Sequence, residues 1–213
     1  MTNCDLRSVR RLGRMIGMRQ VILDVETQKA FDQVGGYFPD RLGISYVGVC
    51  IREGYSGKGD MMGFFEQDLP NLWPILENAD VLIGFNIISF DLETFRPYYS
   101  GNIEKLPVLD ILDRIKDSAG HRVSLDAVAT QTLGVQKSGS GLDALVYYEK
   151  KQFDKLALYC NKDVEITRDV YDYGRSKGMV KFLNKWNRLI ETKVDFGFTP
   201  KKDAGVQMTL LGI

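Results

Sequence analysis

Asp24 and Glu26 lie two positions apart at the end of the apolar run 21–25. The run is rich in β-branched residues and predicts a buried strand. Residues two apart on a strand point to the same face, so both carboxylates leave the sheet together. Such a pair is costly to desolvate unless a cation neutralises it, and Mg²⁺ takes oxygen ligands in proteins. The pair therefore indicates a divalent-cation site, with exposed acids at a strand end as the alternative.

A third carboxylate, that of Asp91, follows another apolar strand. This strand is expected over residues 81–85 and leads into a polar turn containing Asn86 and Ser89, which places Asp91 on the first turn of a helix. Functional groups of open α/β sheets gather beyond the carboxyl ends of the strands. Asp91 can therefore approach the first pair at this edge. A helix N-terminal aspartate favoured by the helix dipole is the alternative interpretation.

Tyr159 and Asp163 supply the last two candidate groups. They lie four residues apart in a helix expected over residues 152–173, so they share one face of it. Leu156 and Ile166 border that face, which indicates that the pair looks toward the protein interior. A surface pair on an amphipathic helix is the alternative.

The elements that would position these residues combine strands and helices. Strands are expected over residues 21–25, 43–51, 62–66 and 81–85, and helices over 68–79, after the Asn86 turn through Phe95, and over 124–133, 142–150 and 152–173. Ser124 suits an N-cap, Gly134 and Gly174 end two helices, and weak alternation over 179–196 predicts a terminal strand pair. Buried strands followed by helices indicate an α/β fold, a mixed sheet flanked by helices.

The 213 residues suffice for one domain, which we place at 20–196, between a basic N-terminal arm (1–19) and a C-terminal tail (197–213). The arm has five arginines against one aspartate, and residues 175–213 have eight lysines and arginines against three acids, although the chain is neutral overall. We expect the arm to be disordered, either as a flexible extension or as a segment upstream of a natural start at Met18. Basic ends around an acidic centre suit a protein that draws a polyanion toward a cation site.

Cysteine and histidine usage excludes several other classes of protein. The three cysteines show no CxxC spacing, and His121 is the only histidine. This argues against a structural zinc site or a disulfide framework and favours a reducing compartment, the cytoplasm. No apolar run reaches the length of a membrane span, so we expect no membrane partner. His121 precedes the 124–133 helix, and we expect it to be a loop residue rather than a catalytic one.

The order and spacing of the acidic motifs resemble those of the DEDDy exonucleases, a branch of the ribonuclease H-like superfamily that includes polymerase proofreading domains. The matching motifs are Asp-x-Glu on the first strand, Asn-x₃-Phe-Asp after a later strand and Tyr-x₃-Asp on a C-terminal helix, within about residues 21–174. The resemblance implies a ribonuclease H-like mixed sheet and a 3′–5′ exonuclease that uses two divalent cations, Mg²⁺ or Mn²⁺. Asp24, Glu26 and Asp163 would hold one cation, Asp24 would bridge toward a second near Asp91, and Tyr159 would position the attacking water.

Within this class the substrate stays open between single-stranded DNA, which we favour, and RNA. A structure-specific endonuclease would use the same acids, and a catalytically idle nucleic-acid adaptor is the alternative of another class. Asn86 and Phe90 are candidate contacts to a terminal nucleotide, although core packing is the simpler role for Phe90. Further candidates are Lys137 and Lys162 for phosphates and Tyr98 and Tyr99 for base stacking.

The C-terminal tail contains the peptide Gln207-Met208-Thr209-Leu210-Leu211. It is similar to the short peptides by which bacterial polymerases and mismatch-repair proteins dock on the sliding clamp. Gln207, Met208, Leu210 and Leu211 would fill the groove of the clamp and raise the local concentration of the enzyme at DNA. A last strand packed on the domain is the alternative.

Overall fold

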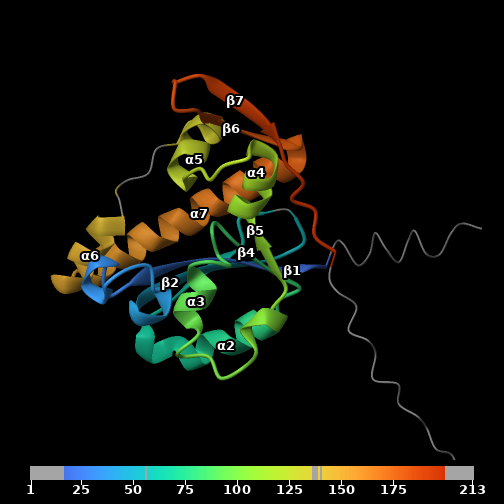
Figure 1. Cartoon of the computed structure of the whole chain (residues 1–213). Coiled ribbons are helices and arrows are strands. Elements are labelled where there is room, and N and C mark those ends of the chain that lie inside the picture. Colours follow the sequence, from blue (N-terminus) through green and yellow to red (C-terminus); the bar gives the residue numbers. More distant parts are fainter. Residues whose placement is uncertain (1–16, 56, 136–138, 140, 200–213) are drawn as a thin grey trace, which may run out of the picture.

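The computed structural model describes residues 17–55, 57–135, 139 and 141–199. A five-stranded sheet in the order β3-β2-β1-β4-β5 runs through its centre (Figure 1). β1 is antiparallel to β2 and parallel to β4, β2 is antiparallel to β3, and β4 is parallel to β5. The strands are β1 (Arg19–Thr27), β2 (Ile44–Glu53), β3 (Asp60–Phe64), β4 (Val81–Gly84) and β5 (Val108–Asp110).

Helices cover both faces of this sheet, which confirms the expected α/β architecture. They are α2 (Leu69–Glu77), α3 (Asp91–Phe95), α4 (Ile111–Ala119), α5 (Leu125–Leu133), α6 (Gly141–Glu149) and α7 (Phe153–Lys177). Short 3₁₀ turns lie at Asp32–Val34, Pro39–Arg41, Glu66–Asp68 and Ile103–Lys105, and a separate antiparallel pair consists of β6 (Met179–Leu183) and β7 (Leu189–Lys193). No helix in the described part of the chain is long and apolar enough to cross a bilayer.

The side chains of β1 alternate between two hydrophobic cores. Val21, Leu23 and Val25 pack in the core formed with α2 and α3. Ile22 packs in the core formed with α4, α5 and α7, which lie on the other side of the sheet in Figure 1. Because residues two apart share a face, the side chains of the next two even-numbered positions of β1 also leave on the α7 side.

Two elements, β5 and α4, were not expected from the sequence. β5 has only three residues, too few for an alternating pattern to be recognised, and it forms because it pairs in parallel with the buried strand β4. α4 carries its apolar residues Ile111 and Ile115 four positions apart, and both are fully buried. Its spacing was therefore a readable signal of an amphipathic helix.

The last long helix extends further than its sequence indicated. The expectation that Gly174 ends it is wrong, because α7 continues to Lys177 and Gly178 adopts the left-handed cap conformation, with φ of 68°. Gly174 instead lies where Phe196 crosses the helix, and an added Cβ would be 2.2 Å from the Phe196 ring. The residue is a glycine because of this close approach rather than because the helix stops.

Candidate active site

Asp24 and Glu26 project from the carboxyl-terminal half of β1, opposite Gly48 and Tyr46 of β2. On the other side of β1, pairing with β4 spans Gln20 to Ile22 and stops there. β1 therefore extends beyond the end of β4 and leaves room beside its last residues. This step in the sheet is where the two carboxylates of β1 meet groups from later in the chain.

Asp91 occupies the step beside β1. β4 ends at Gly84, Asn86 turns the chain with a φ of 70°, and α3 begins at Asp91. Asp91 is only 3% exposed, and its carboxylate accepts hydrogen bonds from its own backbone N–H and from that of Val25. A positive φ is uncommon for a residue with a side chain, although asparagine tolerates it better than most. The turn thus delivers the third carboxylate to the first two.

α7 brings Tyr159 and Asp163 to the same place from the opposite direction. Both side chains are buried, at 6% and 4% exposure, as their shared face and apolar neighbours predicted. The Tyr159 hydroxyl hydrogen-bonds the Asp163 carboxylate. Close approach of the helix depends on Gly48, because a Cβ there would lie 2.9 Å from Asn161 Oδ1 and 3.0 Å from Val164 Cγ2.

Cys160, which the sequence analysis did not select, also faces the carboxylates. Its Sγ lies 3.4 Å from the Asp24 carbonyl oxygen and 3.7 Å from Asp24 Oδ2. Ligand atoms of Asp24, Glu26 and Cys160 all lie within 4.8 Å of one another, close enough to share one metal ion. The signal for Cys160 was its position in the helix, since it precedes Asp163 by three residues and so lies on the same side.

Burial and crowding of like charges perturb the ionisable groups of this cluster. Burial raises the pKa of Asp91 well above its usual range, and the nearby Asp24 carboxylate raises it further. Burial also raises the pKa of Tyr159, with Asp163 and Glu26 adding to the effect. A bound divalent cation would remove this repulsion, and a set of carboxylate oxygens suits Mg²⁺ or Mn²⁺. The carboxylates of this donor set fit the hard cations expected from the sequence, whereas the Cys160 thiol grouped with Asp24 and Glu26 is a soft donor.

Asp110 is a buried acid near the site that sequence reasoning missed. At the end of β5, its carboxylate accepts hydrogen bonds from the backbone N–H of Asn86 at 2.9 Å and of Ile88 at 3.1 Å, and also caps α4 through Leu112 N–H at 2.9 Å. Burial raises the pKa of Asp110, whereas these backbone N–H groups lower it. Asp110 thus fixes the turn that precedes Asp91. An aspartate directly before an amphipathic stretch is the signature of an N-cap.

The two candidate nucleotide contacts, Asn86 and Phe90, lie on this same turn. The Asn86 side-chain oxygen accepts a hydrogen bond from the Arg122 guanidinium. Phe90 is half-buried, and its ring makes an edge contact with that of Phe31 at 6.1 Å between centroids. Phe31 in turn stacks on Tyr37 at 4.7 Å, and Tyr37 is 57% exposed. Phe90 is therefore part of an aromatic cluster at the surface beside Asp91 rather than of the deep core.

The remaining candidates do not join the carboxylate cluster. The Tyr98 hydroxyl donates to Glu66 at 2.6 Å and the Tyr99 hydroxyl to Glu77 at 2.9 Å, and both rings pack against the α2–α3 core, so their role is structural. Lys162 is ion-paired with Glu165 at 3.0 Å. His121 is exposed in a loop, as expected, and contacts Phe182. Lys137 and the peptide Gln207–Leu211 lie outside the described residues.

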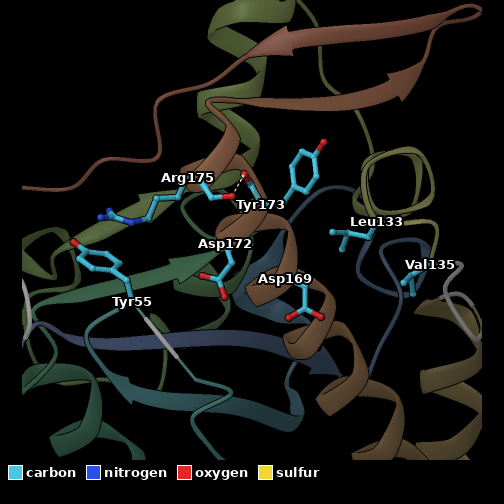
Figure 2. A pocket seen from close by; sticks show the side chains of 8 residues that line it. Tyr55, Leu133, Val135, Asp169, Asp172, Tyr173 and Arg175 are labelled. Carbon is cyan, nitrogen blue, oxygen red and sulfur yellow. Dashed lines mark hydrogen bonds between the residues drawn. The ribbon is translucent and has the colours of Figure 1, made fainter.

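An open hollow of about 840 Å³ lies along the C-terminal half of α7, away from the carboxylates. Figure 2 shows Asp169, Asp172 and Tyr173 on one side and Tyr55 on another. Its acids are neutralised by arginines, since Asp172 pairs with Arg52 at 2.5 Å and Asp169 with Arg168 at 2.8 Å. The hollow therefore offers no cation-binding cluster comparable to the one on β1.

The fold and the cluster of acids together define an α/β protein with a ribonuclease H-like arrangement. The RNase_H superfamily model matches residues 21–174, from the start of β1 through most of α7. The chain belongs to this superfamily. None of the proteins of curated function matches the chain.

Several solved structures are similar to this chain. The family B DNA polymerase of the archaeon Pyrobaculum calidifontis is 16% identical, with a TM-score of 0.52 over 75% of this chain and 24% of the polymerase. E. coli Exonuclease I in complex with an oligonucleotide is 12% identical, with a TM-score of 0.45 over 76% of this chain and 41% of that one. An SSB/Exonuclease I structure in complex with an inhibitor is 14% identical, with a TM-score of 0.49 over 75% of this chain and 42% of that one. The chain thus spans less than half the length of each of these proteins.

Proposed function

We propose that the protein is a two-metal-ion 3′–5′ exonuclease that hydrolyses phosphodiester bonds of single-stranded DNA. The observation that carries the proposal is the convergence of Asp24, Glu26, Asp91 and Asp163 at the end of β1, where burial and mutual repulsion call for cations. A scaffold without chemistry has no reason to maintain such a cluster, because like charges in a partly buried site are destabilising. This argues against a catalytically idle adaptor.

Each side chain has a distinct task in this proposal. Asp24, Glu26 and Asp163 would hold one cation, and Asp24 and Asp91 would hold the second. When bound, the cations supply an activated water and stabilise the leaving 3′ oxygen. A tyrosine hydroxyl is protonated at neutral pH, and burial raises the pKa of Tyr159 further above its ordinary value. Tyr159 therefore orients the attacking water through hydrogen bonds and does not need to act as a base.

The direction of cleavage and the kind of polymer are supported by observations other than the carboxylate cluster. The 3′–5′ direction rests on the resemblance of the three motifs to the DEDDy exonucleases. The aromatic cluster of Phe31, Tyr37 and Phe90 supports a contact to an unpaired terminal base, because base stacking tolerates any sequence. RNA stays as the alternative substrate, since neither stacking nor phosphate contacts distinguish the sugar.

A cleavage assay with end-labelled strands tests the proposal. The purified protein is incubated with 5′- and 3′-labelled single-stranded DNA and RNA in Mg²⁺, Mn²⁺ or EDTA. We expect a ladder of single-nucleotide losses from the 3′ end that requires metal. Asp24→Asn should lower the rate by at least about 100-fold, because one charged ligand of the transition-state assembly is lost.

The matched control is Asp117→Asn, which removes one exposed carboxylate on α4 outside the cluster and should leave the rate unchanged. Internal cuts in duplex or branched DNA would instead identify a structure-specific endonuclease. Binding of strands without any metal-dependent cleavage would identify an adaptor and refute the proposed activity.

The tail sequence supports a further partner. We include docking of Gln207, Met208, Leu210 and Leu211 on a bacterial sliding clamp in the proposal, on the strength of the peptide alone. Docking would hold an enzyme of modest strand affinity at DNA by effective concentration.

A further inference from the structure

The tip of the β6–β7 pair, residues 184–188, presents an aromatic and basic surface that the proposed catalytic site leaves unused. Trp186 is 68% exposed, and the exposed Lys185 and Arg188 stand on either side of it. The neighbouring Leu183 and Leu189 are 40% and 53% exposed. Apolar side chains gathered on a surface and rimmed by charge mark an interaction site. An exposed tryptophan is the side chain best suited to stacking on a planar ligand.

The tip is held in one conformation by its own hydrogen bonds. Asn184 Oδ1 accepts from the backbone N–H of Trp186 at 2.9 Å and of Arg188 at 3.1 Å. The Asn184 N–H donates to the Arg188 carbonyl at 3.0 Å, and Asn187 takes a left-handed φ of 55°. A preorganised turn loses little conformational entropy when it binds a ligand. The exposure of Trp186 is therefore a built feature of the turn.

A chain of contacts connects the tip to the candidate active site. Phe182, two residues before the tip, packs against the His121 ring at 5.6 Å. The next residue, Arg122, is exposed and donates to the Asn86 side chain on the turn that leads to Asp91. β6 is fixed to α5 by the pair of hydrogen bonds between Thr132 and the Lys181 backbone. Figure 1 shows the β6–β7 pair lying across α5, with α7 between it and the sheet.

We propose that this tip is a second contact for single-stranded nucleic acid, in which Trp186 stacks on a base and Lys185 and Arg188 bind phosphates. The inference rests on the proposed function, because it assumes that a strand end lies among the carboxylates. The strand leaves that site past Arg122 and reaches the tip several nucleotides from its end. Stacking on aromatic side chains beside a basic track is the usual way to hold a single strand without reading its sequence.

The charge of the tip selects this partner over a second copy of the chain or another protein. Protein interfaces tend to exclude lysine from their centre, whereas Lys185 lies directly over the Trp186 ring, 4.5 Å from its centroid. A polyanion satisfies the cations and the aromatic ring together, since the phosphates and the bases of a strand alternate along it.

Intrinsic fluorescence reports on the tip directly, because the chain has two tryptophans and the other, Trp73, is half-buried against the α2–α3 core. In the Trp73→Phe protein, Trp186 is the only reporter. Titration with the oligonucleotide dT20 in EDTA, where no cleavage occurs, should quench the emission of Trp186. The affinity obtained from this quenching should be lower at higher salt. The Trp186→Phe protein, which reports from Trp73, should show no quenching.

Affinity is measured in parallel with labelled dT20 by fluorescence anisotropy. Trp186→Ala and the double variant Lys185→Glu/Arg188→Glu should each weaken binding by about tenfold. The matched control is Lys105→Glu/Lys177→Glu, which makes the same change in net charge. Both of its residues are exposed. Lys105 lies in the 3₁₀ turn before β5, and Lys177 lies next to the end of β6 that is opposite the tip, about 20 Å beyond Asp163 along α7.

Kinetics separate this inference from the proposed activity. In Mg²⁺, the tip variants should lose about tenfold in kcat/KM on a 20-mer and nothing on a dinucleotide, which is too short to reach the tip. If the wild type cleaves both substrates and the tip variants match it on both, the proposed function stands and the tip inference is wrong. If the wild type cleaves nothing, the exonuclease proposal fails, and the dT20 titration alone decides the tip. Unquenched Trp186 with unchanged dT20 affinity overturns the inference in either case.

Discussion

The Asp91 carboxyl group is buried beside the Asp24 carboxylate, and both effects raise its pKa. Without a cation, the folded protein therefore binds a proton at Asp91 more tightly than the unfolded chain does. Stability then falls as the pH rises from the unfolded pKa, about 3.9, through the raised folded value. The site therefore destabilises the metal-free protein, and bound cations should restore the stability that the repulsion between carboxylates removes.

Asp91→Asn should accordingly stabilise the metal-free protein. In EDTA at pH 8 we expect the Tm to rise by about 3 °C or more, with the difference from wild type shrinking as the pH is lowered toward 4. Thermal unfolding across this pH range, followed by circular dichroism, measures it. Adding Mg²⁺ should raise the Tm of the wild type more than that of the variant. A Tm gain equal at all pH values would contradict the electrostatic cause.

Tyr159→Phe removes one hydroxyl and keeps the ring that packs beside Asp163. We expect the cleavage rate to fall by about 100-fold, the size of effect that misplacing a reacting group can have. Mg²⁺ affinity, followed by the Mg²⁺-dependent rise in Tm, should be unchanged because the carboxylates stay. Turnover like that of the wild type would show that the hydroxyl does not orient the water.

At the scale of the elements, the site depends on how closely α7 approaches the sheet. Gly48 of β2 lies opposite Asp24, and the Cys160 thiol and the Asn161 amide sit in the space where its Cβ would be. The alternation of β1 sends Asp24 and Glu26 toward the same helix. Two elements distant in sequence are therefore packed so closely that a Cβ at position 48 would displace side chains of α7.

Gly48→Ala tests this packing. The added methyl group should push α7 outward and destabilise the fold by about 1–3 kcal/mol, as overpacking does. The activity should fall by more than the unfolded fraction accounts for, because Tyr159 and Asp163 move with the helix. Gly141→Ala in α6 is the control, because nothing lies within 4 Å of its added Cβ and it should be neutral or stabilising. Full activity of the Gly48 variant would mean that the helix position is not critical.

At the scale of the whole molecule, charge is distributed unevenly. The acids of the site gather in the centre of the chain, whereas the tip residues Lys185 and Arg188 and the segments at both ends of the sequence are basic. If the proposed function holds, these basic segments should attract a polyanion toward the cation-loaded site. The attraction should be strongest at low salt.

Deleting residues 206–213, which carry no charged side chain, tests the proposed clamp-docking peptide. The deletion should abolish binding to a bacterial sliding clamp in a pull-down or a surface-binding assay. The Tm and the rate on short oligonucleotides should be unchanged, because a tether acts only when it shares a template with the enzyme. Clamp binding that survives the deletion would exclude the Gln207 peptide as the docking motif.

The sequence by itself determined which candidate site residues lie together on one face of a strand or helix. The spacing of Asp24 and Glu26, and of Tyr159 and Asp163, is local, and local periodicity fixes a face once the element type is known. The buried strands, the Ser124 cap and the terminal strand pair followed from the same kind of short-range pattern.

Only the tertiary structure decided what those faces meet. That Asp91 would fill the step beside β1 depends on where β4 stops, and that Cys160 would join the carboxylates depends on Gly48. Gly174 looked like a helix end, but its partner Phe196 lies 22 residues further along the chain. The hydrogen bond that the Asn86 N–H donates to the Asp110 carboxylate likewise joins residues 24 positions apart. Such contacts are set by packing between distant segments, and no local pattern encodes them.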